Sequence, residues 1–286
     1  MPWVLRAAWI VVVVAGGEAI DAATLERSSN VADAVTIAAA AGWVAGVAAM
    51  AIPSVVGLTA TRIIVPLAAP AAVMTWIAGG GADAAIFLVL ALLSLVVALS
   101  GELGRVFVQA SAYGEEDRHL LRPPPAYALA AVLTWAVWAA AALATPPLLG
   151  AGSWPLALGA FALALALGVW SWPLWHRLAR RWLVIVPIGI VVHDQLVLGE
   201  TLMLRRPEIA TIRLAPAGTQ AADLTGPAAG HALEILTTES VTAILAGTPR
   251  APGGSAIHLT ACLVAPSRPG RALAGAAARR LPVGDR

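Results

Sequence analysis

The sequence predicts an all-α membrane bundle of six transmembrane helices, followed by a small cytoplasmic all-β domain that ends in a helix. Three observations predict this fold class. The 286 residues are 59% hydrophobic and only 12% charged, whereas soluble globular proteins are about 25% charged. Six apolar stretches are long enough to cross a bilayer. After residue 181 the pattern changes from continuous apolar runs to the alternation that is typical of strands.

The predicted spans are separated by helix breakers, among them Pro53, "GGGAD" at 79–83 and "RPPPA" at 122–126. A crossing helix needs about 20 mostly apolar residues, and six stretches qualify: 3–20, 31–52, 63–78, 84–108, 126–148 and 154–175. A cleaved signal peptide is the alternative for the first stretch, because its apolar core is short and small residues follow it. The predicted domains are therefore a membrane domain, 1–176, and a β-domain, 177–286.

The arginines predict the orientation of these spans, because cytoplasmic loops carry an excess of basic residues. Only Arg27 falls on one side of the predicted membrane. Eight fall on the other side: Arg6, Arg62, Arg105, Arg118, Arg122, Arg177, Arg180 and Arg181. We therefore expect a multi-pass protein of the cell membrane with both termini in the cytoplasm.

Composition and motifs exclude several classes of function. The net charge is only +2 and no dense basic stripe occurs, which argues against nucleic-acid binding. The single cysteine, Cys262, excludes an internal disulfide framework and a multi-cysteine metal site. The chain contains no P-loop, dinucleotide-binding glycine fingerprint, zinc-protease motif or nucleophile elbow. The sequence therefore predicts no catalytic, cofactor-binding or metal-binding residues, and it does not indicate an enzyme.

Residues after the last span alternate in the manner of short strands with one buried and one solvated face. Seven strands are expected, at 181–187, 189–194, 200–206, 209–216, 232–238, 241–247 and 256–266. A helix is expected in the stretch 268–281, in which helix-forming residues follow Pro269. His193 and Asp194 lie at an expected hairpin end, where aspartate suits a turn.

Two resemblances follow from these stretches. The segment "GIVVHDQLVLGETLMLRRPEIATIRL" resembles the first half of bacterial pleckstrin-homology-like (PH-like) domains, which implies a small barrel with a terminal helix. A generic β-sandwich is the alternative. The whole chain is similar to an actinobacterial group of uncharacterised polytopic membrane proteins, through "ASAYGEEDRHLLRPP" (110–124), "RRWLVIVPIGIVVHD" (180–194) and "ALEI" in a later strand. That similarity implies a lineage and no activity.

The most charged part of the membrane half is the predicted cytoplasmic loop 111–122, which ranks first among candidate interaction sites because loops often carry function. Its candidate residues are Glu115, Glu116, Asp117, Arg118, His119 and Arg122. They could bind a metal or a partner. The favoured interpretation is a solvated loop that packs on the C-terminal domain.

A second candidate is the arginine cluster after the last span, Arg177, Arg180 and Arg181. Each basic residue near an anionic membrane surface contributes about 1 kcal/mol to binding, so the cluster should hold this helix end at lipid headgroups. The alternative is a specific lipid-binding pocket.

Glu102 and Arg105 form a candidate intramembrane pair, because residues three apart share one face of a helix. Their place near the end of the fourth span favours an interfacial pair over a buried one. No charge is expected at the middle of any span, which argues against an ion-coupled transporter. The "GWVAG" motif at 42–46 has the spacing that permits close helix packing, here most simply inside the bundle.

These observations favour an accessory or scaffold protein of the membrane. Its β-domain would bind a protein partner or a lipid headgroup at the inner leaflet, so the expected partners are the bilayer, anionic lipid headgroups or another membrane protein. Two alternatives remain: a transporter of an apolar or lipidic solute, and a membrane enzyme that acts on a lipid-linked substrate. Neither the helix count nor the PH-like pattern selects among them, because one fold hosts many functions.

Overall fold

The computed structural model describes residues 2–247 and 252–284 of the chain. It divides into two compact units. The first comprises Met1–Phe107 and Ala130–Trp175, and the second comprises Val108–Leu129 and His176–Arg286. This division differs in one respect from the predicted boundary at residue 176, because the second unit also takes in the segment between the fourth and fifth spans.

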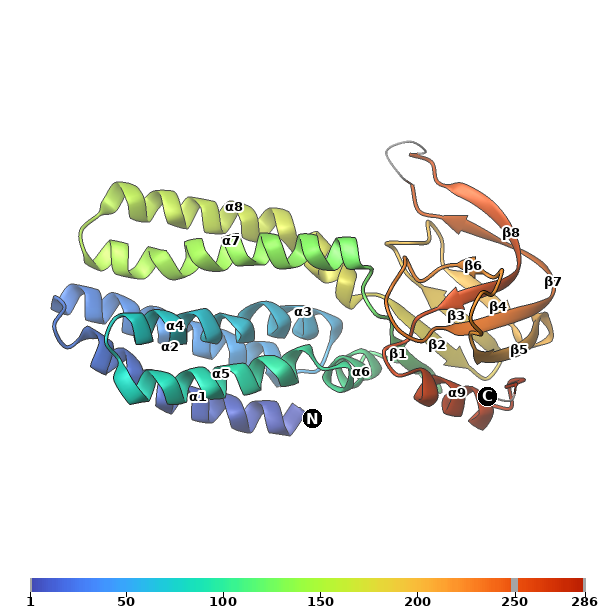
Figure 1. Cartoon of the computed structure of the whole chain (residues 1–286), viewed down its shortest axis with the longest axis horizontal. Coiled ribbons are helices and arrows are strands. Elements are labelled where there is room, and N and C mark those ends of the chain that lie inside the picture. Colours follow the sequence, from blue (N-terminus) through green and yellow to red (C-terminus); the bar gives the residue numbers. More distant parts are fainter. Residues whose placement is uncertain (1, 248–251, 285–286) are drawn as a thin grey trace. The chain divides into compact units, whose positions relative to one another are not determined.

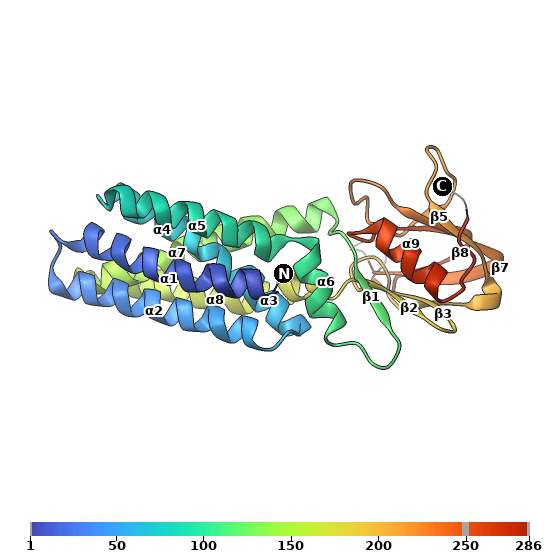
Figure 2. The same ribbon diagram turned by 90° about the horizontal axis from the view of Figure 1, so that it is seen from below.

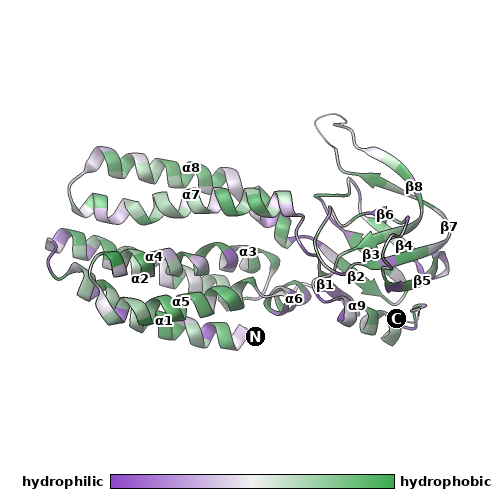
Figure 3. Ribbon diagram, viewed as in Figure 1, coloured by the Kyte–Doolittle hydropathy of each residue, from purple (hydrophilic) through white to green (hydrophobic). Residues whose placement is uncertain are grey.

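Helices make up the first unit, and their residues are predominantly hydrophobic (Figures 1 and 3). Within the described residues, six helical runs are long and apolar enough to cross a membrane. Five of these runs are single helices: α1 (Pro2–Thr24), α2 (Ser29–Ala51), α5 (Gly81–Leu99), α7 (Pro125–Gly150) and α8 (Trp154–Ala179). The remaining run, Val55–Ile77, joins α3 (Val55–Ile64) to α4 (Ala68–Ile77) through the 3-10 turn η1 (Val65–Leu67).

Two predicted spans have different ends in the structure because serine residues set the helix boundaries. The third run begins at Val55 rather than at 63, after Ser54, whose side chain accepts a hydrogen bond from the Gly57 N–H. The fourth run ends at Leu99, because Ser100 is extended, with ψ 145°. A separate helix, α6 (Gly101–Gln109), follows and turns away from α5 (Figure 2).

The candidate pair Glu102 and Arg105 lies on α6. The predicted span 84–108 therefore consists of two helices, and the pair lies outside the apolar run Gly81–Leu99. A charged pair on a short separate helix does not have to cross the hydrocarbon region.

Two arginines of the first unit cap the C-terminal ends of neighbouring helices. The Arg6 guanidinium donates to the carbonyl oxygens of Met50 (2.6 Å) and Ala51 (3.0 Å), the last residues of α2. The Arg62 Nε donates to the Ala98 carbonyl near the end of α5. Carbonyl groups at a helix C-terminus lack partners within the helix and carry partial negative charge, so both arginines satisfy and stabilise these ends.

Tryptophan and glycine fix the contact between α1 and α2. The Trp9 indole N–H donates to the Trp43 carbonyl, and the Trp43 indole N–H donates to the Trp9 carbonyl, both at 3.1 Å. A Cβ at Gly46 would lie 2.6 Å from the Trp9 ring, whereas a Cβ at Gly42 would meet nothing within 4 Å. Gly46 of the "GWVAG" motif therefore packs inside the bundle.

The second unit contains two four-stranded sheets (Figure 1). The first has the antiparallel order β1-β2-β3-β4, from β1 (Asp117–Leu120), β2 (Trp182–Val186), β3 (Gly189–His193) and β4 (Leu202–Arg205). The second has the order β5-β7-β8-β6, from β5 (Ile209–Leu214), β6 (Ala222–Asp223), β7 (Leu233–Leu245) and β8 (Ser255–Val264). The 3-10 turn η2 (Arg206–Glu208) joins the sheets, and α9 (Pro269–Ala278) packs against β2 and β5 (Figure 2).

One hydrophobic core is shared by both sheets and α9. Alternate residues of each strand enter it, since successive side chains of a strand point to opposite faces. Its members include Leu183, Ile185, Ile190, Val192, Leu204, Ile212, Leu233, Ile235, Cys262, Val264, Ala272 and Ala276. The two sheets therefore pack face to face, and α9 closes the core with alanines.

Three features of the sheets depart from the predicted strands. The predicted strands 232–238 and 241–247 form one strand, β7, with an irregular register between Leu236 and Val241. The two-residue strand β6 was not predicted. Nor was β1, which lies inside the charged segment that was predicted to be a loop.

The position of β1 in the chain gives the second unit an unusual connection. β1 pairs with β2, with Asp117 opposite Ile185 and Leu120 opposite Trp182. Between these two neighbouring strands the chain makes the two apolar helices α7 and α8. A helical hairpin long enough to cross a membrane twice is thus inserted between adjacent strands of one sheet.

Candidate functional site

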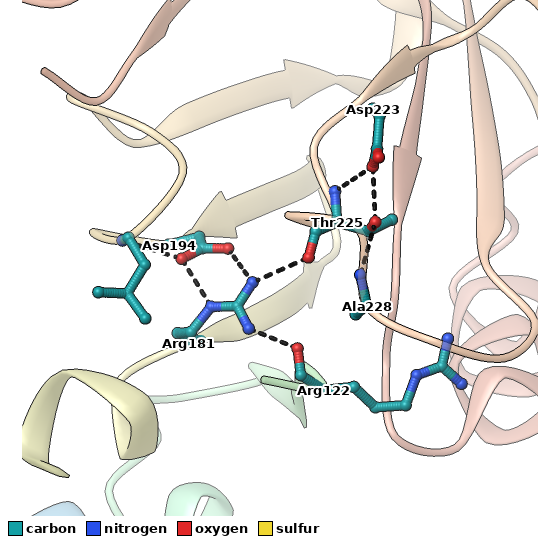
Figure 4. A network of polar contacts seen from close by, with 7 residues as sticks. Arg122, Arg181, Asp194, Asp223, Thr225 and Ala228 are labelled. Carbon is teal, nitrogen blue, oxygen red and sulfur yellow. Dashed lines mark hydrogen bonds and ion pairs between the residues drawn. The ribbon is translucent and has the colours of Figure 1, made fainter. Parts of the chain in front are cut away.

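A buried arginine, Arg181, lies in the second unit immediately before β2 (Figure 4). Arg181 forms a two-pronged ion pair with Asp194: Nε donates to Oδ1 at 2.7 Å, and Nη2 donates to Oδ2 at 2.5 Å. Nη1 donates to the Arg122 carbonyl, and Nη2 also lies 3.4 Å from the Thr225 carbonyl. The two charged side chains are only 1% and 0% exposed. We call Arg181, Asp194 and the carbonyls of Arg122 and Thr225 the Arg181 clamp.

Strand register places the two charges of the clamp together. Arg181 immediately precedes β2 and Asp194 immediately follows β3, and Trp182 pairs with His193 across this hairpin. Arg181 and Asp194, each one residue beyond this pair, are therefore also neighbours. Asp194 Oδ1 additionally accepts the Leu196 N–H at 3.1 Å, which fixes the carboxylate.

The clamp holds both chain connections of the inserted helices within the second unit. Arg122 lies three residues before Pro125, where α7 begins, and Arg181 lies two residues after Ala179, where α8 ends. The Leu121 N–H also donates to the Arg181 carbonyl at 2.9 Å. Replacing a buried ion pair by apolar residues is often neutral, whereas removing one partner is costly. Arg181 therefore depends on Asp194 for its burial.

Arg181 corrects one prediction. We expected it to anchor the end of the last helix at lipid headgroups together with Arg177 and Arg180. Instead its guanidinium is enclosed by protein and completely paired. Only Arg177 and Arg180 remain available for a membrane surface.

The loop that supplies Thr225 is itself held by local hydrogen bonds (Figure 4). Asp223 Oδ1 accepts the Thr225 N–H at 2.7 Å and its hydroxyl at 2.6 Å, and the Thr225 Oγ1 accepts the Ala228 N–H at 3.2 Å. The Arg122 side chain crosses to the same region and donates to the His231 carbonyl at 2.6 Å. Desolvation by burial lowers the pKa of Arg122.

Glu115, Asp117 and His119 meet the C-terminal helix. The Asp117 Oδ2 lies 3.2 Å from His119 Nε2 and 3.7 Å from Arg279 Nη1, and Arg279 Nη2 donates to the Glu115 carbonyl at 2.6 Å. Gly275 of α9 leaves room for this group, because a Cβ there would lie 2.5 Å from the Asp117 carboxylate. His119 is only 2% exposed, so these residues tie β1 to α9.

This arrangement agrees with packing of the charged segment on the C-terminal domain. Among the described residues, no group of three or more histidine, cysteine, aspartate or glutamate side chains could hold a metal ion. The metal-binding alternative for the segment therefore has no support in its geometry.

On the first sheet, a column of stacked side chains crosses β1, β2 and β3. The Arg118 guanidinium lies 5.3 Å from the centre of the Trp182 ring, and the Trp182 and His193 rings stack at 5.0 Å with 20° between their planes. Glu116 fixes Arg118 with two contacts of 2.9 and 2.7 Å. His193 Nδ1 lies 3.1 Å from the Thr201 hydroxyl. We call Arg118, Trp182 and His193 the stacked column.

His193 has an electropositive environment. Its pKa is lowered, first by desolvation and then by the nearby charges of Arg180 and Arg118, while Asp194 opposes the shift. Its Nε2 atom is buried and has no hydrogen-bond partner within the described residues. This environment therefore favours the neutral form of the imidazole.

The positive charge beside the column is not compensated. Neither Arg177 nor Arg180 forms an ion pair within the part of the chain that the structure describes. The nearest acidic groups are already occupied, because Asp194 binds Arg181 and Glu116 binds Arg118. Arg177 is exposed and Arg180 is partly exposed, so both guanidinium groups can attract an anion from outside the protein.

No protein-family model, curated protein or solved structure matches the chain.

The candidate residues separate into three groups in the structure. Arg122 and Arg181 belong to the clamp, Arg118 and Arg180 belong to the stacked column or its surroundings, and Glu115, Asp117 and His119 pack against α9. Sequence reasoning missed Asp194, Thr225, Trp182, His193 and Arg279. The predicted 181–187 and 189–194 hairpin did contain a signal for Asp194, because it places an aspartate opposite an arginine at its open end.

Proposed function

We propose that this chain is a multi-pass membrane scaffold, with both termini in the cytoplasm, whose second unit binds anionic lipid headgroups of the inner leaflet. The observation that carries the proposal is that Arg177 and Arg180, at the end of α8 and just after it, form no ion pair within the described residues. Arg177 lies in the last turn of α8, so the chain itself keeps both cations within a few residues of the hydrocarbon region.

The orientation is supported by the arginine distribution and by electrostatics. Cytoplasmic leaflets carry negative surface potential, which attracts basic residues next to a span. With the second unit in the cytoplasm, Arg177 and Arg180 meet the anionic leaflet. The opposite orientation would place Arg27 alone on that side.

We further propose that the second unit is a PH-like domain interrupted by a membrane hairpin. The support is its order of elements: four antiparallel strands, then β5, β7 and β8, then the helix α9. In this proposal α7 and α8 replace the first hairpin loop of the domain. The Arg181 clamp keeps the interrupted strands β1 and β2 in register.

Headgroup recognition would use the guanidinium groups of Arg177 and Arg180. They donate charge-assisted hydrogen bonds to phosphate oxygens, for which arginine geometry is well suited.

The contacts of the charged segment favour headgroup binding over an enzymatic activity of residues 111–122. An enzyme that used residues 111–122 would need its acidic groups to reach a substrate. Asp117 is instead engaged with His119 and Arg279, and His119 is buried beneath α9. These side chains serve the fold of the second unit.

The test measures binding of a short-chain anionic lipid to the full chain in mild detergent. Dioctanoyl phosphatidylglycerol is titrated against dioctanoyl phosphatidylcholine, and bound lipid is counted by native mass spectrometry. We expect phosphatidylglycerol to bind preferentially, and the double variant Arg177→Gln, Arg180→Gln to weaken it about 30-fold, at about 1 kcal/mol for each arginine. The double variant Arg205→Gln, Arg206→Gln, whose arginines are also exposed, is the matched control for loss of two charges.

Two results would overturn the proposal. One is equal binding of the two lipids by the wild-type chain. The other is an equal loss of phosphatidylglycerol binding in the two double variants, which would indicate only a general effect of net charge. Co-purification of a stoichiometric protein with the wild type and not with Arg177→Gln, Arg180→Gln would assign the surface to a protein partner instead.

A further inference from the structure

Residues of α7 and α8 line an open groove of about 410 Å³ in the first unit. Volumes of about 300–1,000 Å³ are typical of small-molecule sites. Nine residues line the groove: Trp138, Ala142, Thr145, Pro146, Phe161, Ala164, Leu165, Gly168 and Val169. None of them is ionisable, so an occupant of this groove is uncharged.

Polar groups in the groove wall are few, and one of them is already satisfied. The Thr145 hydroxyl donates to the Ala141 carbonyl of its own helix at 2.9 Å. The indole N–H of Trp138 is different. Its Nε1 lies beside Gly168, 3.2 Å from the position that a Cβ would occupy, and it forms no hydrogen bond within the described residues.

Four other tryptophans of the helical bundle have a hydrogen-bond acceptor for the indole N–H, which Trp138 does not have within the described residues. Each donates its N–H to a backbone carbonyl at 3.0–3.1 Å: Trp9 to Trp43, Trp43 to Trp9, Trp135 to Ile63 and Trp175 to Ala131. A buried indole N–H usually finds an acceptor, and an unsatisfied donor in hydrocarbon costs several kcal/mol. Trp138, whose ring packs edge-on against Trp175, therefore presents a free donor to the groove.

The depth of this donor restricts which molecule can accept from it. Trp138 is the fourteenth residue of a 26-residue helix, so it lies about 20 Å along a helix of about 39 Å. That is the middle of a hydrocarbon core about 30 Å thick. Ester oxygens of glycerolipids lie near the edges of this core, whereas an uncharged lipid with oxygen atoms on its ring can enter the centre.

We infer that the α7–α8 groove binds a lipid-soluble quinone, one carbonyl oxygen of which accepts the hydrogen bond from Trp138 Nε1. Its hydrocarbon tail then lies along the apolar wall made by Phe161, Leu165 and Val169. Gly168 is required because a larger residue would close the space next to the indole nitrogen. This site is independent of the cationic surface of the second unit.

The test counts bound molecules by native mass spectrometry of the full chain in detergent. Menaquinone-4 is the probe, and squalene, an isoprenoid hydrocarbon without oxygen, is the matched ligand. We expect one menaquinone-4 to bind saturably and more tightly than squalene. Trp138→Phe should remove most of that preference, about 2- to 10-fold, which is the effect of one hydrogen bond.

Two further variants separate the groove from general effects on the bundle. Gly168→Leu fills the groove and should abolish binding of both ligands. Trp135→Phe removes an indole N–H that is bonded elsewhere and should leave the preference unchanged. Equal affinity of the wild type for the two ligands overturns the inference, as does an unchanged preference in Trp138→Phe. If Trp138→Phe does not fold, the ligand comparison on the wild type and on Gly168→Leu still decides.

Discussion

Replacing Asp194 by asparagine tests whether the Arg181 clamp holds the interrupted sheet together. The substitution keeps the size of the side chain and removes its charge. Arg181 then remains buried with its Nε and Nη2 groups facing a neutral amide, where they had contacts of 2.7 and 2.5 Å to a carboxylate. We expect the second unit to open locally much more often, because a buried cation without a counter-charge is strongly unfavourable.

The structure sets the magnitude of this effect. Both side chains are almost completely excluded from water, so solvent screens the pair little. Removing one partner of such a pair costs about 3–5 kcal/mol. Because about 1.4 kcal/mol corresponds to a factor of ten, amides that exchange through this opening should exchange about 10²- to 10⁴-fold faster.

Hydrogen exchange of the full chain in detergent, read by mass spectrometry, measures the effect. Peptides that cover β1, β2 and β3 should lose protection in Asp194→Asn, while peptides of α1 and α2 should not change. Glu116→Gln is the matched control. It breaks the Arg118 pair, whose members are 11% and 27% exposed, and partly exposed pairs contribute about 1 kcal/mol or less.

A compensating variant separates the charge from the shape of the site. Arg181→Met combined with Asp194→Leu removes both charges, and an apolar replacement of a buried pair is often neutral. We expect the double variant to exchange more slowly than Asp194→Asn alone. Wild-type exchange rates in Asp194→Asn would refute the reasoning, since they would show that the buried charge is not stabilised by its partner.

Three further predictions concern other parts of the chain. Burial raises the pKa of the Cys262 thiol to about 12. A maleimide reagent at pH 7.5 should therefore label the full chain only after denaturation. Rapid labelling of the native chain would contradict the burial of Cys262 in the core. Gly46→Ala should lower the melting temperature, because its Cβ overlaps the Trp9 ring and overpacking costs about 1–3 kcal/mol, whereas Gly42→Ala should not. The lowered pKa of His193 means that the folded second unit favours the neutral imidazole; stability is therefore complete above the unfolded pKa of about 6.5 and falls as pH drops through the folded value. His193→Phe should flatten this pH dependence in thermal melts, and an unchanged pH profile would refute it.

The helical runs were predictable because hydrocarbon imposes a strong and local requirement. About 20 apolar residues must follow one another, and six such runs are present in the described chain. Their ends depend on finer chemistry. Ser54 caps the third run, and Ser100 stops the fourth, but serine also occurs inside helices, so hydropathy alone did not place these boundaries.

Strand β1 could not be predicted from its own residues. It has four residues, Asp117–Leu120, three of them ionisable, and it shows no continuous apolar face. Its partner β2 begins more than 60 residues later, beyond α7 and α8. Pairing over such a separation is encoded by the partner strand and by α9, which meets the charged side chains of β1.

The same limit explains why Arg181 was assigned to the membrane surface. A run of arginines after an apolar helix is typical of a cytoplasmic helix end, and the rule counts each arginine equally. Which arginine turns inward depends on the β2–β3 hairpin, whose register brings Asp194 beside Arg181. That information lies in the pairing of the strands and not in the charge count.

The arginines that predict the orientation of the spans differ in whether they have partners within the protein. Most of the eight on the predicted cytoplasmic side have partners within the protein: Arg6 and Arg62 cap helix ends, Arg118 binds Glu116, Arg122 binds the His231 carbonyl, and Arg181 binds Asp194. A cation that is already paired adds little to attraction by a membrane surface. Arg177 and Arg180 have no ion-pair partner among the described residues, and the sequence places both at the end of the last span. Because an unpaired cation there is favourable next to an anionic leaflet, the two arginines that the fold leaves unused are the ones that the proposed headgroup site requires.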